Sequence, residues 1–134
     1  MPSKKPNPFH MLFADITNQN MSIHGSQEEP DTESHLSVSI QAIARDGLFK
    51  GQELDLQISR KQDFDETNKY AGALFQSKPR LMFAVSTTPE RFGYIVSLIA
   101  QKALKEIYLC IEPPKYSKAK IISWQVSTEV EPEE

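Results

Sequence analysis

Two segments of this sequence combine basic and aromatic side chains and could bind a nucleic acid. Residues 115–120 (Lys-Tyr-Ser-Lys-Ala-Lys) place three ammonium groups and one aromatic ring on a single connection. Residues 45–51 form a second group of the same kind. Lysines attract phosphates and release their counterions, and an aromatic ring can stack on an unpaired base. The candidate ligand-binding residues are therefore Arg45, Phe49, Lys50, Lys115, Tyr116, Lys118 and Lys120.

The alternative interpretation of both segments is a solvated hairpin tip, where lysine opposes edge-to-edge aggregation. Residues 36–127 carry 13 basic and 9 acidic side chains, a balance of +4 that is too weak to require a nucleic-acid partner. Residues 1–35 hold 2 basic and 5 acidic groups, and residues 128–134 hold 4 acids and no base. The whole-chain charge of −3 therefore conceals a mildly basic body between acidic flanks.

Residues 63–67 (Asp-Phe-Asp-Glu-Thr) match the D-x-D-x-T pattern of a class of phosphatases. That chemistry needs the first aspartate, here Asp63, at the end of a buried parallel strand as the nucleophile, with Asp65 as acid or base. A polar pair precedes the segment instead, and the surrounding sheet is expected to be antiparallel. The segment also fails as a calcium loop, because Asn68 stands where glycine is required. We interpret the match as coincidence.

The histidines and the single cysteine do not form a recognisable site. His10, His24 and His35 lie 14 and 11 residues apart, which is not the close pairing typical of zinc ligands. Cys110 lies in an apolar stretch, where a thiol packs as a small hydrophobe, whereas a reactive cysteine needs an electropositive, partly open site. The sequence therefore predicts no catalytic residue, no metal and no cofactor, in a protein that is not an enzyme.

Apolar and polar residues alternate in several stretches, as in a strand with one face on the core. This alternation is found in residues 36–44, 54–60 and 121–127, and residues 81–86 and 107–111 are predicted strands with large apolar side chains at every second position. Asp46-Gly47 and Gly51 are turn signals between the first two, which should pair as an antiparallel hairpin. Trp124 is most simply a core residue, or a stacking platform if it faces outward. The sequence leaves two interpretations of residues 61–79, a short helix or an irregular crossing segment.

The residue types and their spacing predict a helix over residues 88–104. Pro89 fits the first turn, where its missing N–H costs nothing. Most apolar side chains share one half of the helical wheel, but Tyr94 and Leu98 fall outside it. A strand over residues 92–100 is the competing interpretation, because that stretch contains β-branched residues and a glycine.

The expected order from residue 36 is β-β-β-α-β-β, after an N-terminal strand. This order resembles that of an OB-type barrel, whose binding loops connect the first two and the last two strands. A helix-covered sheet or a small sandwich shares the order. We therefore expect a mainly β fold, a β-barrel or β-sandwich with one α-helix. Residues 1–35 should form an arm with one or two short strands and an acidic loop, residues 36–127 one β-rich domain, and residues 128–134 an acidic tail.

The sequence also predicts a soluble protein without a membrane segment. Its 134 residues are enough for one domain. The longest nearly apolar stretch, residues 94–100, is too short to cross a bilayer. The first residues include two lysines but no apolar run behind them, so no secretory signal is expected. Without a signal or a disulfide framework, a cytoplasmic location is the expectation.

The leading hypothesis is a small non-enzymatic binding or assembly module that acts through protein–protein contacts, including those of a homodimer. Its support is the chemically mixed flanks and the strand edges that could pair with a partner. The alternative is an OB-type protein that binds single-stranded nucleic acid through the two basic segments. The third hypothesis is a small enzyme, in which carboxylates such as Asp63, Asp65 and Glu112 would meet a histidine or lysine in a pocket.

Overall fold

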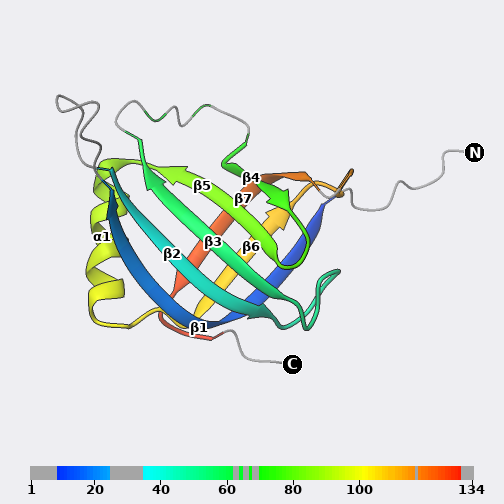
Figure 1. Cartoon of the computed structure of the whole chain (residues 1–134), viewed down its shortest axis with the longest axis horizontal. Helices are drawn as coiled ribbons and strands as arrows, with labels where there is room; N and C mark the ends of the chain where they lie inside the picture. Colours follow the sequence, from blue (N-terminus) through cyan, green and yellow to red (C-terminus); the bar gives the residue numbers. More distant parts are fainter. Residues whose placement is uncertain are drawn as a thin grey trace, which may run out of the picture.

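The computed structural model describes residues 9–24, 35–61, 64, 67, 70–116 and 118–130. Along these residues the chain forms seven strands and one helix. The elements are β1 (His10–His24), β2 (His35–Ala44), β3 (Glu53–Arg60), β4 (Gly72–Gln76), β5 (Leu81–Thr87), α1 (Pro89–Ala100), β6 (Glu106–Ile111) and β7 (Ala119–Ser127). The strands close into a barrel, and the helix lies against one end of it (Figure 1). The expected mainly β fold with one helix is confirmed, as a barrel rather than a sandwich.

The barrel has the strand order β1-β2-β3-β5-β4-β7-β6, and β6 returns to β1. Every neighbouring pair is antiparallel except β3 and β5, which run parallel. β2 and β3 form the predicted hairpin, in register from Ser37 opposite Ser59 to Ile43 opposite Glu53. Because the pairing closes on itself, most strand edges are covered by another strand.

β1 is one strand of 15 residues, where the sequence predicted an arm with one or two short strands. Its first part pairs with β6, with His10 opposite Ile111, and its second part pairs with β2. The register to β2 shifts between Ile16 and Asn18. A bulge bends a strand and increases its twist, so one strand can serve both neighbours. The predicted acidic loop over residues 25–33 lies outside the described residues.

β4 lies in the segment that the sequence left open between a short helix and an irregular crossing. It pairs with β5 on one side and, from Gly72 to Leu74, with β7 on the other. The close approach of β5 requires glycine at position 72, because a Cβ there would overlap the carbonyl oxygen of Ala84. The register to β5 shifts between Leu74 and Gln76, so Phe75 is the extra residue of a bulge. The predicted order of elements is therefore correct except for β4.

α1 begins where the sequence predicted a helix, and the alternative of a strand is excluded. The Oγ1 of Thr88 accepts a hydrogen bond of 3.2 Å from the backbone N–H of Arg91, and Pro89 lies in the first turn. The helix ends at Ala100, earlier than predicted, and Lys102 then adopts a left-handed φ of 53°. Among the described residues, no helix is long and apolar enough to cross a membrane.

Leu104, which the sequence placed on the helix, is buried beyond the end of α1. The side-chain amide of Gln19 binds both of its backbone groups. Nε2 of Gln19 donates to the Leu104 carbonyl oxygen at 3.0 Å, and the Leu104 N–H donates to Oε1 of Gln19 at 3.2 Å. This amide satisfies two buried backbone groups and ties the connection between α1 and β6 to β1.

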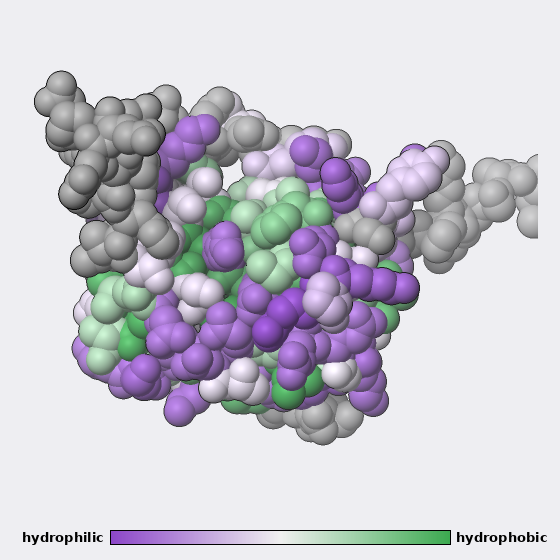
Figure 2. Space-filling view, in the orientation of Figure 1, coloured by the Kyte–Doolittle hydropathy of each residue, from purple (hydrophilic) through white to green (hydrophobic). Residues whose placement is uncertain are grey.

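Alternate side chains of the strands fill the barrel, and the helix covers one end with Phe92, Ile95 and Ile99. The strand residues of the core include Leu12, Val38, Ile40, Leu54, Leu56, Ile58, Phe83, Leu109 and Ile121. Burial of each such large side chain contributes roughly 2 kcal/mol to stability. The outer face of the wall that contains β2, β3 and β5 is mostly hydrophilic, with an apolar area near its middle (Figure 2). The alternation predicted for these strands therefore separates core from solvent.

Candidate functional site

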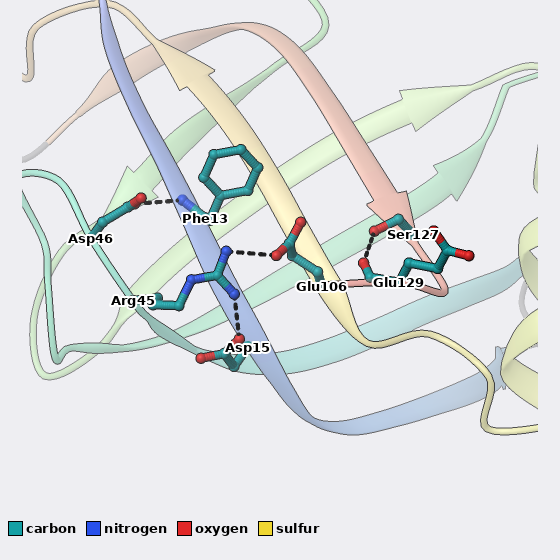
Figure 3. Close-up of polar contacts among 7 residues, drawn as sticks. All are labelled: Phe13, Asp15, Arg45, Asp46, Glu106, Ser127 and Glu129. Atoms are coloured by element: carbon teal, nitrogen blue, oxygen red, sulfur yellow. Dashed lines mark hydrogen bonds and ion pairs between the residues drawn. The ribbon is translucent and has the colours of Figure 1, made fainter. Parts of the chain in front are cut away.

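Arg45, one of the predicted ligand-binding residues, lies in an ion-pair cluster beside β1 and β6 (Figure 3). Its Nη1 lies 2.8 Å from Oδ1 of Asp15, and its Nη2 lies 2.7 Å from Oε2 of Glu106. Its guanidinium carbon is 5.4 Å from the centre of the Phe13 ring. The hydrogen bond to Glu106 is the main cause that raises the pKa of Arg45 above its ordinary value. Two carboxylates thus neutralise this cation within the fold.

The rest of the loop between β2 and β3 packs onto β1. Oδ1 of Asp46 accepts a hydrogen bond of 2.7 Å from the backbone N–H of Phe13. Gly47 has a φ of 77°, and a Cβ there would lie 2.8 Å from a carbonyl oxygen of β1, so this turn needs glycine. The side chain of Phe49 is 9% exposed and belongs to the core. Of the three candidate residues in this loop, only Lys50 is exposed to solvent.

A depression of about 330 Å³ lies next to the ion-pair cluster. Phe13 and Tyr108 line it, with ring centroids 5.1 Å apart. The Oγ of Ser127 donates a hydrogen bond of 2.7 Å to the carbonyl oxygen of Glu129, which holds the chain after β7 along its rim. Burial raises the pKa of Tyr108 above its ordinary value of 10.0, so its phenol keeps its proton to a higher pH than an exposed tyrosine does. The buried carboxylate of the depression is already paired with a guanidinium, so this surface offers packing rather than acid–base chemistry.

Three predicted lysines come together around a hollow of about 480 Å³ beside β4 and the start of β7. This Lys115–Lys120 hollow is lined by Ala73, Leu74, Phe75, Glu112, Pro113, Lys115, Lys118, Ala119 and Lys120. No ion pair joins these lysines to a carboxylate within the described part of the chain. Tyr116, in the same loop, is 97% exposed and has a φ of 53°. The structure thus assembles the second basic segment but not the first.

A second hollow of about 430 Å³ continues from the first. It is lined by Lys61, Phe64, Tyr70, Ala71, Gly72, Ala73, Ala84, Ser86 and Lys120. The Nζ of Lys120 lies 5.9 Å from the centre of the Tyr70 ring, within the range of a cation–π contact. Because the two hollows share Ala73 and Lys120, the lysines and the rings of Phe75 and Tyr70 line one continuous surface.

A cleft of about 710 Å³ separates α1 from the second half of β7. This α1–β7 cleft is lined by Phe64, Tyr70, Ala71, Ser86, Thr87, Arg91, Tyr94, Ile95, Leu98, Ile122, Ser123, Trp124 and Val126. Tyr94 and Leu98, the two helix residues outside the predicted apolar stripe, both line it. Tyr94 is 66% exposed, and Trp124 is partly buried against the core. Sequence reasoning did not identify this cleft, although the two misplaced apolar side chains were a signal for it.

The neighbours of β7 change along this cleft. Residues 119–121 pair with β4, but no strand among the described residues pairs with residues 122–127 on that side. β6 covers the opposite edge as far as Ser127. Residues 121–127 contain no charged residue and no proline, which are the usual protection of an exposed strand edge. This edge could therefore accept a further strand.

The remaining candidates for catalysis or metal binding add no site. Asp63, Asp65 and the side chains of His24 and His35 lie outside the described residues. Cys110 is buried, as expected for a structural thiol. Over the residues that the structure describes, no group of three or more His, Cys, Asp or Glu side chains could hold a metal ion. A scan against protein-family models and searches of curated proteins and of solved structures found no match for this chain.

Proposed function

We propose that this chain is a non-enzymatic binding module that takes up an extended segment of a partner polypeptide in the α1–β7 cleft. The observation that carries the proposal is the edge of β7 over residues 122–127, which has no strand partner among the described residues. A strand edge presents a row of backbone donors and acceptors, and an extended peptide can complete them. This edge of β7 thus supports the protein–protein function expected from the sequence and gives the proposal a specific surface to test.

The side chains of the α1–β7 cleft support a preference for an apolar partner. Tyr94 and Leu98 line it from the helix, and Trp124 lines it from the strand. Alternate side chains of an added strand point to the same face, so every second residue of the partner would meet these groups. Tyrosine and tryptophan offer large apolar surfaces with few rotamers to restrict. The partner is therefore an extended segment with apolar residues at alternate positions.

The charges of the barrel support binding rather than catalysis. Glu106 is the one charged side chain that is buried in the described part of the chain, and it is ion-paired with Arg45. A general acid or base must be able to exchange a proton with a substrate within hydrogen-bond reach, which this paired carboxylate does not favour. The cytoplasmic location expected from the sequence belongs to the same proposal, supported by the unpaired thiol of Cys110.

The test selects ligands without assuming their identity. A phage-displayed library of short random peptides is selected on the wild-type chain, and enriched peptides are synthesised and titrated by fluorescence anisotropy. The variant Tyr94→Ser removes an exposed ring from the cleft. The control Leu48→Ser removes an exposed apolar side chain from the loop between β2 and β3, at the other end of the barrel (Figure 1).

We expect peptides with alternating apolar residues that bind Tyr94→Ser at least about tenfold more weakly than the wild type. The same peptides should bind Leu48→Ser as tightly as the wild type. Peptides that bind both variants equally well, or a library that yields no enriched peptide, would contradict the proposal. Sedimentation of the chain alone adds one outcome: a dimer that Tyr94→Ser dissociates and Leu48→Ser does not would replace the separate partner by a second copy of the chain.

A further inference from the structure

We propose that the Lys115–Lys120 hollow, which shares no lining residue with the α1–β7 cleft, binds the phosphate backbone of a single-stranded nucleic acid. Three ammonium groups line the hollow, together with one carboxylate, that of Glu112. The chain as a whole has a net charge of −3, so this local positive surplus does not follow from its composition. Such a concentration of cations attracts phosphates and gains free energy from counterion release.

The local backbone places the three lysines on one side of the molecule. The N–H groups of Lys115 and Lys118 each donate to the other's carbonyl oxygen, at 2.7 and 2.9 Å. Residues directly opposite in such an antiparallel bridge project to the same face. Lys118, directly before β7, and Lys120 flank the buried Ala119, so their side chains lie on the outer side of the barrel. The backbone thus presents the three ammonium groups together, before any ligand binds.

Aromatic rings next to the lysines supply the stacking that a single strand requires. Phe75, the extra residue of the β4 bulge, lines the hollow with 43% of its surface exposed. Tyr70 follows in the adjacent hollow, where Nζ of Lys120 is 5.9 Å from its ring centre. The bases of a single strand can stack on such rings, whereas those of a duplex are already stacked on each other. This combination favours a single-stranded nucleic acid over a duplex or a lipid surface.

The test follows the anisotropy of fluorescein-labelled oligothymidylate with the full chain at increasing salt. Contacts from three lysines imply a slope of log affinity against log salt of about −2. The double variant Lys115→Gln/Lys118→Gln should bind at least about tenfold more weakly, with a slope of about −0.7. The control Lys50→Gln/Lys105→Gln makes the same change in charge at two exposed lysines outside the hollow. It should retain wild-type binding.

Two further variants separate ring stacking from charge, and the Lys115–Lys120 hollow from the α1–β7 cleft. Phe75→Ser should weaken binding and leave the salt slope unchanged, because it removes a ring and no charge. Tyr94→Ser should leave oligonucleotide binding unchanged, which distinguishes this surface from the α1–β7 cleft. Four outcomes would each overturn the proposal: no binding at low salt, equal losses in the two double variants, tighter binding to a duplex of the same length, or binding to phosphatidylserine vesicles in place of the oligonucleotide.

Discussion

Nη2 of Arg45 lies 2.7 Å from Oε2 of Glu106, whose side chain is only 3% exposed. The two residues are 61 positions apart in the sequence, and their contact joins the loop after β2 to the first residue of β6. Asp15 of β1 contacts the same guanidinium group. Three segments of the barrel therefore meet at one cation, which ties them together.

Removing the Arg45 cation alone should destabilise the fold more than removing the charges of Arg45 and Glu106 together. In Arg45→Met the buried Glu106 carboxylate loses the guanidinium group that lies 2.7 Å from it, and we expect the free energy of unfolding to fall by about 3 kcal/mol. The double variant Arg45→Met/Glu106→Leu should recover part of that loss, because the buried carboxylate is removed and Asp15, whose side chain is 52% exposed, stays solvated. Urea unfolding measures both, with Lys50→Met as the control for an exposed cation of the same loop. A loss below about 1 kcal/mol in Arg45→Met, typical of a surface ion pair, would contradict the structural role.

Replacing Gly72 and Gly93 by alanine should change the stability of the fold in opposite directions. In Gly72→Ala the new methyl group would overlap the carbonyl oxygen of Ala84, and we expect a loss of at least about 2 kcal/mol. In Gly93→Ala the new Cβ meets no atom within 4 Å beyond the neighbouring residues and the backbone of its own helix, and the helix should gain about 0.5 to 1 kcal/mol. Thermal unfolding of both variants checks the pair. Equal effects at the two positions would mean that β4 does not pair with β5 as described.

The Gln19 side chain should stabilise the fold through its two hydrogen bonds to the backbone of Leu104. Gln19→Leu keeps the size and burial of the side chain but leaves two buried backbone groups without their partner, at a cost of about 2 kcal/mol. The control Gln57→Leu makes the same change at an exposed position of β3. Hydrogen exchange of the Leu104 amide should accelerate in the first variant only. An unchanged exchange rate at Leu104 in Gln19→Leu would rule out this role of the amide.

Tyr108 should make the stability of the barrel fall as the pH rises in the alkaline range. Burial raises the pKa of Tyr108 above its usual value of 10.0. Above pH 10 the unfolded chain loses the phenol proton while the folded chain keeps it, so stability falls as the pH rises toward the folded pKa. The contribution of this group is complete at lower pH. Tyr108→Phe should therefore flatten the decline of the unfolding free energy above pH 10, and identical declines in the two proteins would count against it.

The strands of the barrel differ in how well the sequence predicts them. In β2, in β3 as far as Ile58, and in β5, every second described side chain is buried. The sequence shows this in β2 and β3 as alternating apolar and polar residues, and in β5 as large apolar residues at positions 81, 83 and 85. β4 has only five residues, and its bulge leaves Phe75 exposed, so the alternation is broken. In β1 the polar residues 17–20 resemble a loop, although the backbone continues through them as a strand. β1 and β4, the two strands whose extent could not be predicted, thus each contain a register shift to a neighbouring strand.

The candidate residues divide according to the distance of their partners along the chain. The lysines of the Lys115–Lys120 hollow are close in the sequence, so their clustering could be predicted from it. Arg45 and Phe49 could not be placed, because the groups that pair with the first and bury the second come from distant strands. Tyr94 and Leu98 departed from the apolar stripe of the helix, but only the tertiary structure brings β7 beside them.

Amide hydrogen exchange of the chain, with and without the tightest selected peptide, tests most directly whether a partner segment pairs with β7. In the free chain, edge amides within residues 122–127 should exchange faster than those of β2, which has a strand on both sides. With the peptide, these β7 amides should slow by at least about tenfold while β2 is unchanged. Residues 122–127 that are already as protected as β2 in the free chain, or protection by the peptide that falls elsewhere on the barrel, would contradict the account.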